Sequence, residues 1–416
     1  MHVPDRPPRR VAVIGAGMVG LATAWFLQEH GAEVTVLDRS GVGAGASWGN
    51  AGYLAPVMAV PLPEPGLLAE GLRGLPDPAA PLHLSPRLQR STLAFLLRFA
   101  ARSTPRAWRS GMAALTPLDR AALPAFDDLA AGGVTAPTHE APILVGFPRP
   151  GADAALRHEL AGVAAAGQDV RLSTPTAVGP PFSDRIATVL RVDGQRHIDP
   201  GGYLAALADS VRARGGRIVA GTRARAIRFG PGGLQVDTWT QPPEPADAVV
   251  VATGAWLPEL ARPLGVRLPV QAGRGYSFSA GVDRPWTHPV YLPTARAALT
   301  PLGDRVRVAG TMEIADRDAP FDGRRVAAIV GSIAPYLTGV DLSDLRDPWV
   351  GPRPLTPDGL PLIGATRMPG VHVAGGHGMW GVTLGPVTGR LLARKMMTTD
   401  PVPELTPFDP LRRRIA

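Results

Sequence analysis

The sequence has 416 residues, of which 45% are hydrophobic and 19% charged, so it carries enough apolar material for a large core and a disordered chain is excluded. It contains no cysteine, which excludes disulfides, thiolate metal sites, iron–sulfur clusters and any cofactor bonded through cysteine. The formal net charge of +8 comes almost entirely from scattered arginines, because Lys395 is the only lysine, and we expect no nucleic-acid partner.

The N-terminal segment has the pattern of a βαβ unit. Val11–Ile14 is wholly apolar and predicts a buried parallel strand. The motif Gly-Ala-Gly-Met-Val-Gly of residues 15–20 follows, and a helical pattern then ends at Gly31. Val34–Leu37 predicts a second strand, which ends at Asp38. A chain of this length is expected to form two or three domains, at about 150 residues each.

A G-x-G-x-x-G motif between a strand and a helix, with an acidic residue after the next strand, predicts dinucleotide binding. Gly15 is expected to make the tight turn, and Gly17 to let the backbone approach a pyrophosphate at the helix N-terminus. Gly20 would let the helix pack on the strand. Asp38, next to Arg39, would accept hydrogen bonds from ribose hydroxyls. The motif alone does not distinguish FAD from NAD.

Residues 41–52 form a loop of small residues that would admit a flat ring, with Ser47 and Asn50 available to bond phosphate or ring edges. A flexible linker is the alternative. From Pro56 to about Pro150 prolines are frequent and helical patches such as Thr92–Arg102 occur, so we expect an inserted region outside the sheet.

Further nucleotide-domain elements are expected after Asp199. The sequence predicts a helix over 202–214, strands over 217–220, 248–252 and 371–374, antiparallel strands between 263 and 348, and a helix over 383–397.

Several segments resemble the FAD-dependent D-amino-acid oxidase superfamily, in particular its bacterial D-amino-acid dehydrogenase branch, with glycine oxidase as a cousin. The resembling segments are Val11–Asp38, Ala46–Gly52, Val250–Trp256, Gly273–Ser277, Trp349–Gly364 and Gly376–Thr383. The resemblance is strong at both ends and diffuse across Val57–Arg191.

The resemblance implies an α/β fold in which a discontinuous Rossmann-like FAD-binding domain carries a substrate domain of mixed antiparallel sheet and helices. We expect the FAD-binding domain to comprise residues 1–56, 195–262 and 348–416, and the substrate domain 57–194 and 263–347. The resemblance and the motif together assign these residues to the cofactor: Gly15, Ala16, Gly17, Met18, Val19, Gly20, Asp38, Arg39, Ala46, Ser47, Asn50, Ala51, Gly52, Ala224, Thr253, Gly254, Gly351, Gly376, Gly378, Met379, Gly381, Val382 and Thr383.

Within this set, Ala224 is expected to meet adenine through its backbone and Gly254 to lie near the pyrophosphate. The Gly376–Thr383 turn would cover the pyrimidine edge of the flavin, where a helix N-terminus stabilises negative charge. Some relatives attach flavin through a histidine, and Gly49 stands at that position here. We therefore expect FAD to be bound non-covalently.

Arg353 is the residue that the resemblance assigns to the substrate carboxylate, because guanidinium offers a bidentate fork and stays protonated. The alternative is a structural ion pair between Arg353 and a nearby acid such as Asp358. The residues around Asp358 have the pattern of a turn. His377 is expected either to contact flavin or substrate or to be hydrogen-bonded within its glycine turn.

The substrate side chain is expected to meet an apolar pocket. Met379 stands where glycine oxidase would have a second arginine, which weakens a glycine-oxidase assignment. Tyr276, Tyr53 and Tyr291 are candidates to line the pocket, with core tyrosines as the alternative.

The expected activity is oxidation of a D-amino acid or a cyclic secondary amino acid by hydride transfer to flavin N5. Three alternatives stay open: an oxidase of N-methyl or cyclic amines, a flavin-holding protein without amine turnover, and a nicotinamide enzyme. The electron acceptor (a quinone, another carrier or O2) and the oligomeric state stay open. No apolar run reaches the ~20 residues of a membrane span, so a cytoplasmic protein is expected, with peripheral membrane contact left open.

Overall fold

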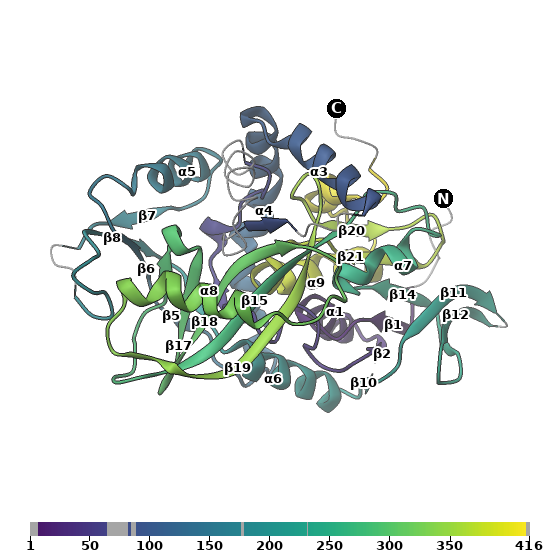
Figure 1. The fold of residues 1–416 in the computed structure, drawn as a ribbon. Helices are drawn as coiled ribbons and strands as arrows, with labels where there is room; N and C mark the ends of the chain where they lie inside the picture. Colours follow the sequence, from purple (N-terminus) through teal and green to yellow (C-terminus); the bar gives the residue numbers. More distant parts are fainter. Residues whose placement is uncertain (1–6, 65–81, 85–88, 176–178, 231, 413–416) are drawn as a thin grey trace.

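The protein was analysed as a computed structural model, which describes residues 7–64, 82–84, 89–175, 179–230 and 232–412 (Figure 1). The described α-helices are α1 (Met18–Glu29), α3 (Arg90–Arg102), α4 (Pro105–Ala131), α5 (Ala154–Ala165), α6 (Pro200–Ala213), α7 (Leu257–Ala261), α8 (Gly323–Ile333) and α9 (Gly381–Met397).

The described strands form four sheets. They are β1 (Arg10–Ile14), β2 (Glu33–Leu37), β3 (Tyr53–Leu54), β4 (Leu82–Leu84), β5 (His139–Glu140), β6 (Ile143–Phe147), β7 (Arg171–Ser173), β8 (Thr188–Asp193), β9 (Arg196–His197), β10 (Arg217–Val219), β11 (Ala224–Gly230), β12 (Gly233–Thr238), β13 (Glu244–Ala246), β14 (Ala248–Val251), β15 (Gln271–Val282), β16 (Val290–Leu292), β17 (Ala297–Leu302), β18 (Arg305–Ile314), β19 (Val340–Leu355), β20 (Leu362–Ala365) and β21 (Val371–Gly375).

The predicted Rossmann-like domain is built on a six-stranded sheet in the order β10-β2-β1-β14-β21-β20, in which only β20 runs antiparallel to its neighbour. Val11 and Val13 of β1 face a core shared with α1, α4, α6 and α9, whereas Ala12 and Ile14 face a core shared with β12 and α7. Burial on both faces explains why β1 is a continuous apolar run. The βαβ pattern of the sequence is confirmed.

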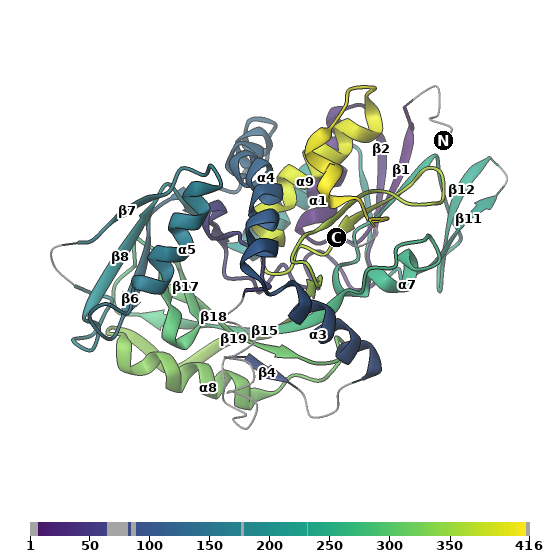
Figure 2. The ribbon, with the colours of Figure 1, turned by 90° about the horizontal axis from the view of Figure 1, so that it is seen from above.

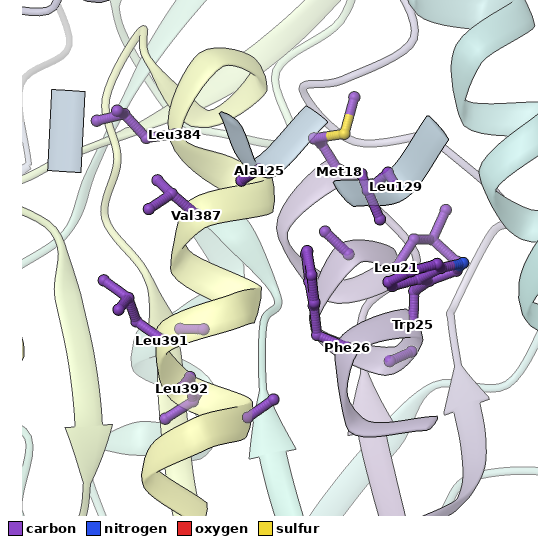
Figure 3. Packing of buried hydrophobic residues seen from close by; sticks show 14 of the residues in the cluster. Met18, Leu21, Trp25, Phe26, Ala125, Leu129, Leu384, Val387, Leu391 and Leu392 are labelled. Carbon is purple, nitrogen blue, oxygen red and sulfur yellow. The ribbon is translucent and has the colours of Figure 1, made fainter. Parts of the chain in front are cut away.

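Helices α1 and α9 lie side by side beneath this sheet. Figure 3 shows Met18, Leu21, Trp25 and Phe26 of α1 beside Leu384, Val387, Leu391 and Leu392 of α9. A Cβ atom at Gly389 would come within 2.7 Å of the α1 backbone, so this glycine lets the helices approach closely. Helix α9 begins at Gly381, two residues earlier than the sequence indicated.

The predicted mixed sheet has nine strands, with the path β19-β15-β18-β17-β16-β6-β8-β7 and β4 beside β18. One face packs on α8, where Tyr276 and Phe278 of β15 meet Ile329 and Ile333. At the other end, α5 packs over β6 and β8 through Leu160 and Val163, among other side chains. Figure 2 shows α4 between α5 and α9, above this sheet. The domain boundaries stay predictions; the one at residue 348 falls inside β19.

Candidate active site

A cavity lies at the carboxyl ends of the parallel strands β1, β2, β14 and β21, the edge at which open α/β sheets bind ligands. We call it the strand-end cavity; its space between atoms is about 1220 Å³, including its opening to solvent. It brings together most of the residues predicted to bind the cofactor: Gly15, Gly17, Met18, Val19, Asp38, Arg39, Ala46, Ser47, Asn50, Ala224, Thr253, Gly254, Gly378, Met379, Gly381 and Val382.

The remaining predicted cofactor residues do not line this cavity. Ala51 and Thr383 line a second cavity, described below. Ala16, Gly20, Gly52, Gly351 and Gly376 line neither. Gly20 packs against the backbone of the glycine motif, where a Cβ would lie 1.9 Å from the Gly15 oxygen. The structure therefore supports a packing role for Gly20.

The glycine motif presents the N-terminus of α1 to the strand-end cavity. Gly15 has φ +115°, and a Cβ there would come within 2.4 Å of the Ala252 oxygen, so only glycine fits this turn. The Ser47 hydroxyl accepts a hydrogen bond from the Met18 N–H at 3.1 Å. Ser47 therefore fixes the loop against the helix N-terminus, where backbone N–H groups favour an anion.

Asp38 is anchored by three backbone donors. Its Oδ2 accepts from the Ala16 N–H at 2.8 Å, and its Oδ1 accepts from the N–H groups of Ser40 and Gly41, both at 2.8 Å. A carboxylate has about four acceptor sites, so Asp38 can hold both loops at the cavity edge and still accept from a ribose hydroxyl.

The strand-end cavity is also lined by an aromatic and ionic cluster, of which the sequence predicted only Arg39. The Arg39 guanidinium stacks over Trp256 at 3.8 Å and pairs with Asp318 at 3.3 Å. The Trp256 indole donates to the same carboxylate at 3.1 Å. Glu259, which lines the cavity with Trp256, pairs with Arg223 at 3.2 Å. The sequence feature that could have pointed to this cluster is the position of Trp256, just after Thr253 and Gly254.

The glycine turn before α9 closes another side of the strand-end cavity. The Gly378 N–H donates to the Pro354 oxygen at 2.9 Å, which ties the turn to β19. His377 Nε2 lies 2.9 Å from the Thr388 hydroxyl of α9, and its Nδ1 has no partner among the described residues. Burial lowers the pKa of His377 to about 3, so the ring is neutral. Its observed bond is to α9 rather than within the turn.

A second cavity, called here the large cavity, meets the strand-end cavity at Asn50, Arg353 and Met379, which line both. Its space between atoms is about 2890 Å³, including its opening to solvent. Its apolar wall includes Met58, Val60, Leu62, Phe147, Leu156 and Trp380, and Tyr53 and Tyr291 also line it.

The loop at this junction is fixed to the nine-stranded sheet. Ser277 of β15 donates its hydroxyl hydrogen to the Gly49 oxygen at 2.7 Å, and Thr300 of β17 donates to the Ala51 oxygen. The Asn50 side chain accepts from the Gly52 N–H at 2.9 Å. These bonds argue against the alternative of a flexible linker.

Arg353 is half-buried where the two cavities meet and lines both of them. Its Nη1 donates to the Thr311 oxygen at 3.3 Å, and no carboxylate pairs with it in the described part of the chain. Burial lowers the pKa of Arg353 to about 10, which still leaves it protonated at neutral pH. The alternative ion pair is wrong, because Asp358 pairs instead with Arg412 at 3.0 Å. A partly buried cation without a counter-charge favours an anionic ligand.

Tyr276 does not line either cavity, and the structure corrects its predicted place. Alternate residues of a strand face opposite sides of the sheet. Gly275 faces the Arg353 guanidinium, so Tyr276 points to the other side, where its hydroxyl donates to Glu313 at 2.9 Å and its ring packs near Phe321.

Tyr53 does line the large cavity, but its hydroxyl is engaged by the main chain. The hydroxyl donates to the Val290 oxygen at 2.6 Å and accepts from the Leu299 N–H at 3.2 Å. Burial raises the pKa of Tyr53 well above its usual value. Tyr53 is therefore placed as a wall of the cavity rather than as a free acid or base.

Comparison with known proteins shows the family to which this chain belongs. The family described as "DAO: FAD dependent oxidoreductase" matches residues 10–395. D-amino acid dehydrogenases of Cereibacter sphaeroides and Methylobacterium radiotolerans are both 33% identical; each match covers 92% of this chain, and 91% and 94% of those proteins.

Solved structures of the same fold include two oxidases. Glycine oxidase from Geobacillus kaustophilus has a TM-score of 0.72 at 21% identity, covering 98% of this chain and 100% of its own. Iminodiacetate oxidase from Chelativorans sp. BNC1 has a TM-score of 0.69 at 20% identity, covering 96% and 99%. In the described part of the chain, no helix is both long and apolar enough to span a bilayer.

Proposed function

Because the chain belongs to the DAO family of FAD-dependent oxidoreductases, we propose that it oxidises a D-amino acid, or a cyclic secondary amino acid, to the imine. The observation that carries this proposal is Arg353, a half-buried guanidinium that has no carboxylate partner among the described residues and lies at the junction of the two cavities. In this proposal, Arg353 binds an amino acid by its carboxylate beside the strand-end cavity.

The residues of the strand-end cavity fit FAD. The α1 N-terminus and the close-packed Gly15 turn suit a pyrophosphate, and Asp38 retains acceptor capacity for a ribose. The Thr253 hydroxyl is buried there without a hydrogen-bond partner among the described residues, as expected of a group that awaits a ligand. The α9 N-terminus lies at Gly381, in the cavity wall. When bound, FAD supplies the two-electron acceptor.

We further propose that FAD is held without a covalent bond. The chain has no cysteine, and the position of the attachment histidine of some relatives is Gly49. A Cβ at Gly49 would lie 2.1 Å from the Trp349 ring. A histidine at this position would therefore displace the indole.

Arg353 performs the binding and orienting steps of the proposed reaction. Its paired N–H donors hold the substrate carboxylate, which fixes Cα relative to the junction. The hydrogen at Cα leaves with its electron pair as a hydride, while the lone pair of the neutral amine forms the C=N bond. Loss of the nitrogen proton leaves the imine, which water hydrolyses to the 2-oxo acid and ammonia, or which persists as a ring if the amine is cyclic. Holding this geometry accounts for several kcal/mol of the barrier.

Anaerobic reduction of the purified flavoprotein tests the proposal. D-amino acids, their L-enantiomers, N-methyl amino acids and cyclic secondary amino acids are each mixed with the protein, and the flavin absorbance near 450 nm is followed. The proposal predicts bleaching by D-amino acids, or by cyclic ones, before the others. Bleaching only by N-methyl amines would favour the amine-oxidase alternative, and no bleaching by any amine would favour a flavin-holding protein. Oxygen consumption compared with dye reduction then identifies the class of electron acceptor.

A further inference from the structure

The large cavity also contains a carboxylate, opposite in sign to Arg353. Glu159 of α5 lines this cavity and is half-buried. Its carboxylate has neither a hydrogen bond nor an ion pair among the described residues, and the one positive group that acts on it there is the Arg296 guanidinium. A partly buried carboxylate in this condition is stabilised by a ligand that brings a positive charge or a strong donor.

Glu159 and Arg353 belong to opposite ends of the large cavity. Arg353 reaches from β19 to the Thr311 oxygen of β18, whereas α5 packs over β6. In the sheet order, β18 and β6 are separated by three strand spacings through β17 and β16, which is about 14 Å at ~4.8 Å per spacing. Both side chains line the large cavity, as do Tyr291 of β16 and Ala298 of β17. A ligand that contacts both charges therefore has to be long.

The space between these charges is mainly apolar. Met58, Leu62, Phe147 and Leu156 form part of its wall. Methylene groups are stabilised along such a wall by roughly 0.8 kcal/mol each when they are buried. The cavity thus combines an anion-binding end, an apolar middle and a carboxylate.

Apart from Tyr53 and Tyr291, four other charged or titratable side chains of the described residues line the large cavity. Burial has the largest effect on the pKa of Glu159 and raises it. The nearby charge of Glu64 raises this pKa further, and that of Arg296 lowers it. The resulting pKa is about 7. Arg109 and His158 are exposed.

We propose, building on the proposed function, that Glu159 is a specificity-determining residue that binds the positively charged end of the substrate side chain. The preferred substrates are then D-amino acids whose side chain has a methylene stem and ends in an amine or a guanidine. Arg353 binds the carboxylate of such a substrate, the stem lies along the apolar wall, and Glu159 binds the terminal cation.

Two pairs of substrates, each with one member that lacks the terminal positive charge, test this assignment. D-arginine is compared with D-citrulline, and D-lysine with D-norleucine, by the rate of anaerobic flavin reduction. The wild-type protein is expected to prefer the charged member of each pair by about 10- to 100-fold in kcat/KM, the range of a charge-assisted hydrogen bond. Glu159→Gln keeps the shape of the side chain and should remove most of this preference, with the neutral substrates changed less than about threefold. Glu140→Gln, an exposed carboxylate on β5 outside both cavities, is the matched control and should preserve it.

A pH profile provides a second readout that a merely structural role would not produce. Glu159 is protonated below pH 7 and charged above it, so KM for D-arginine should fall as pH rises through about 7, whereas KM for D-citrulline should not. Glu159→Gln should abolish this difference, and His158→Gln should retain it.

The two proposals fail in distinguishable ways. If D-norleucine and D-citrulline reduce the flavin as well as the charged substrates in both wild type and Glu159→Gln, the specificity assignment is wrong and the proposed function stands. If none of the four D-amino acids reduces the flavin, the proposed function fails and this inference fails with it.

Discussion

The guanidinium of Arg353 lies against the backbone of Gly275 on the neighbouring strand: a Cβ at Gly275 would come within 2.1 Å of the Arg353 Cζ. The two residues belong to β19 and β15, which pair antiparallel. The missing side chain leaves the space in which the arginine lies at the junction of the two cavities. The position of the proposed carboxylate-binding group thus depends on a glycine in another segment of the chain.

Gly275→Ala should displace Arg353 and raise KM for the amino-acid substrate by about 10-fold or more, since a misplaced binding group loses much of its orienting effect. FAD content should stay near that of wild type. Steady-state kinetics and the flavin-to-protein absorbance ratio measure both quantities. Gly281→Ala, on the same strand but with only ordinary contact at the added Cβ, is the control. An unchanged KM for Gly275→Ala would mean that Arg353 does not bind substrate from this position.

Asp38→Ala should weaken FAD retention, because it removes a charge-assisted acceptor worth about 1.5–3 kcal/mol for the ribose. The same substitution also frees three backbone N–H groups, so the thermal unfolding of the apoprotein is measured in parallel. Asp38→Asn keeps the shape and one acceptor oxygen, and should have an intermediate effect. Titration of the apoprotein with FAD gives the dissociation constant; equal affinity in all three proteins would place the ribose elsewhere.

Acid precipitation of the purified protein should release all of the flavin as FAD. The reason is the absence of cysteine together with the contact between Gly49 and Trp349. Absorbance and chromatography of the supernatant measure the released cofactor. Flavin that remains in the washed pellet would show a covalent bond and contradict the expectation.

The sequence predicted those structural elements that depend on a short, local pattern of residues. The β1 run, the glycine motif and Asp38 specify one βαβ unit, and their residues meet in one cavity. Which residues of β15 face the cavities was not predictable from its composition, because the adjacent residues Gly275 and Tyr276 face opposite sides of the sheet and both sides are apolar. The cluster of Arg39, Trp256 and Asp318 joins segments that are 62 or more residues apart in the sequence, so no local pattern could predict it. Glu159 lies in the stretch where the family resemblance is diffuse, and only the folded cavity brings it to notice.

The most direct test of the central claim is the anaerobic flavin reduction of wild type and Arg353→Leu by a D-amino acid and by its amide, which lacks the carboxylate charge. Arg353→Leu should lower kcat/KM for the acid roughly 30- to 4,000-fold, which corresponds to a loss of about 2–5 kcal/mol of transition-state stabilisation. The kcat/KM for the amide and the FAD content should change little. Arg274→Leu, which removes a buried arginine that pairs with Glu313 at 3.1 Å, should affect acid and amide equally. An equal loss for acid and amide in Arg353→Leu, or loss of its flavin, would give Arg353 a structural role and contradict the account.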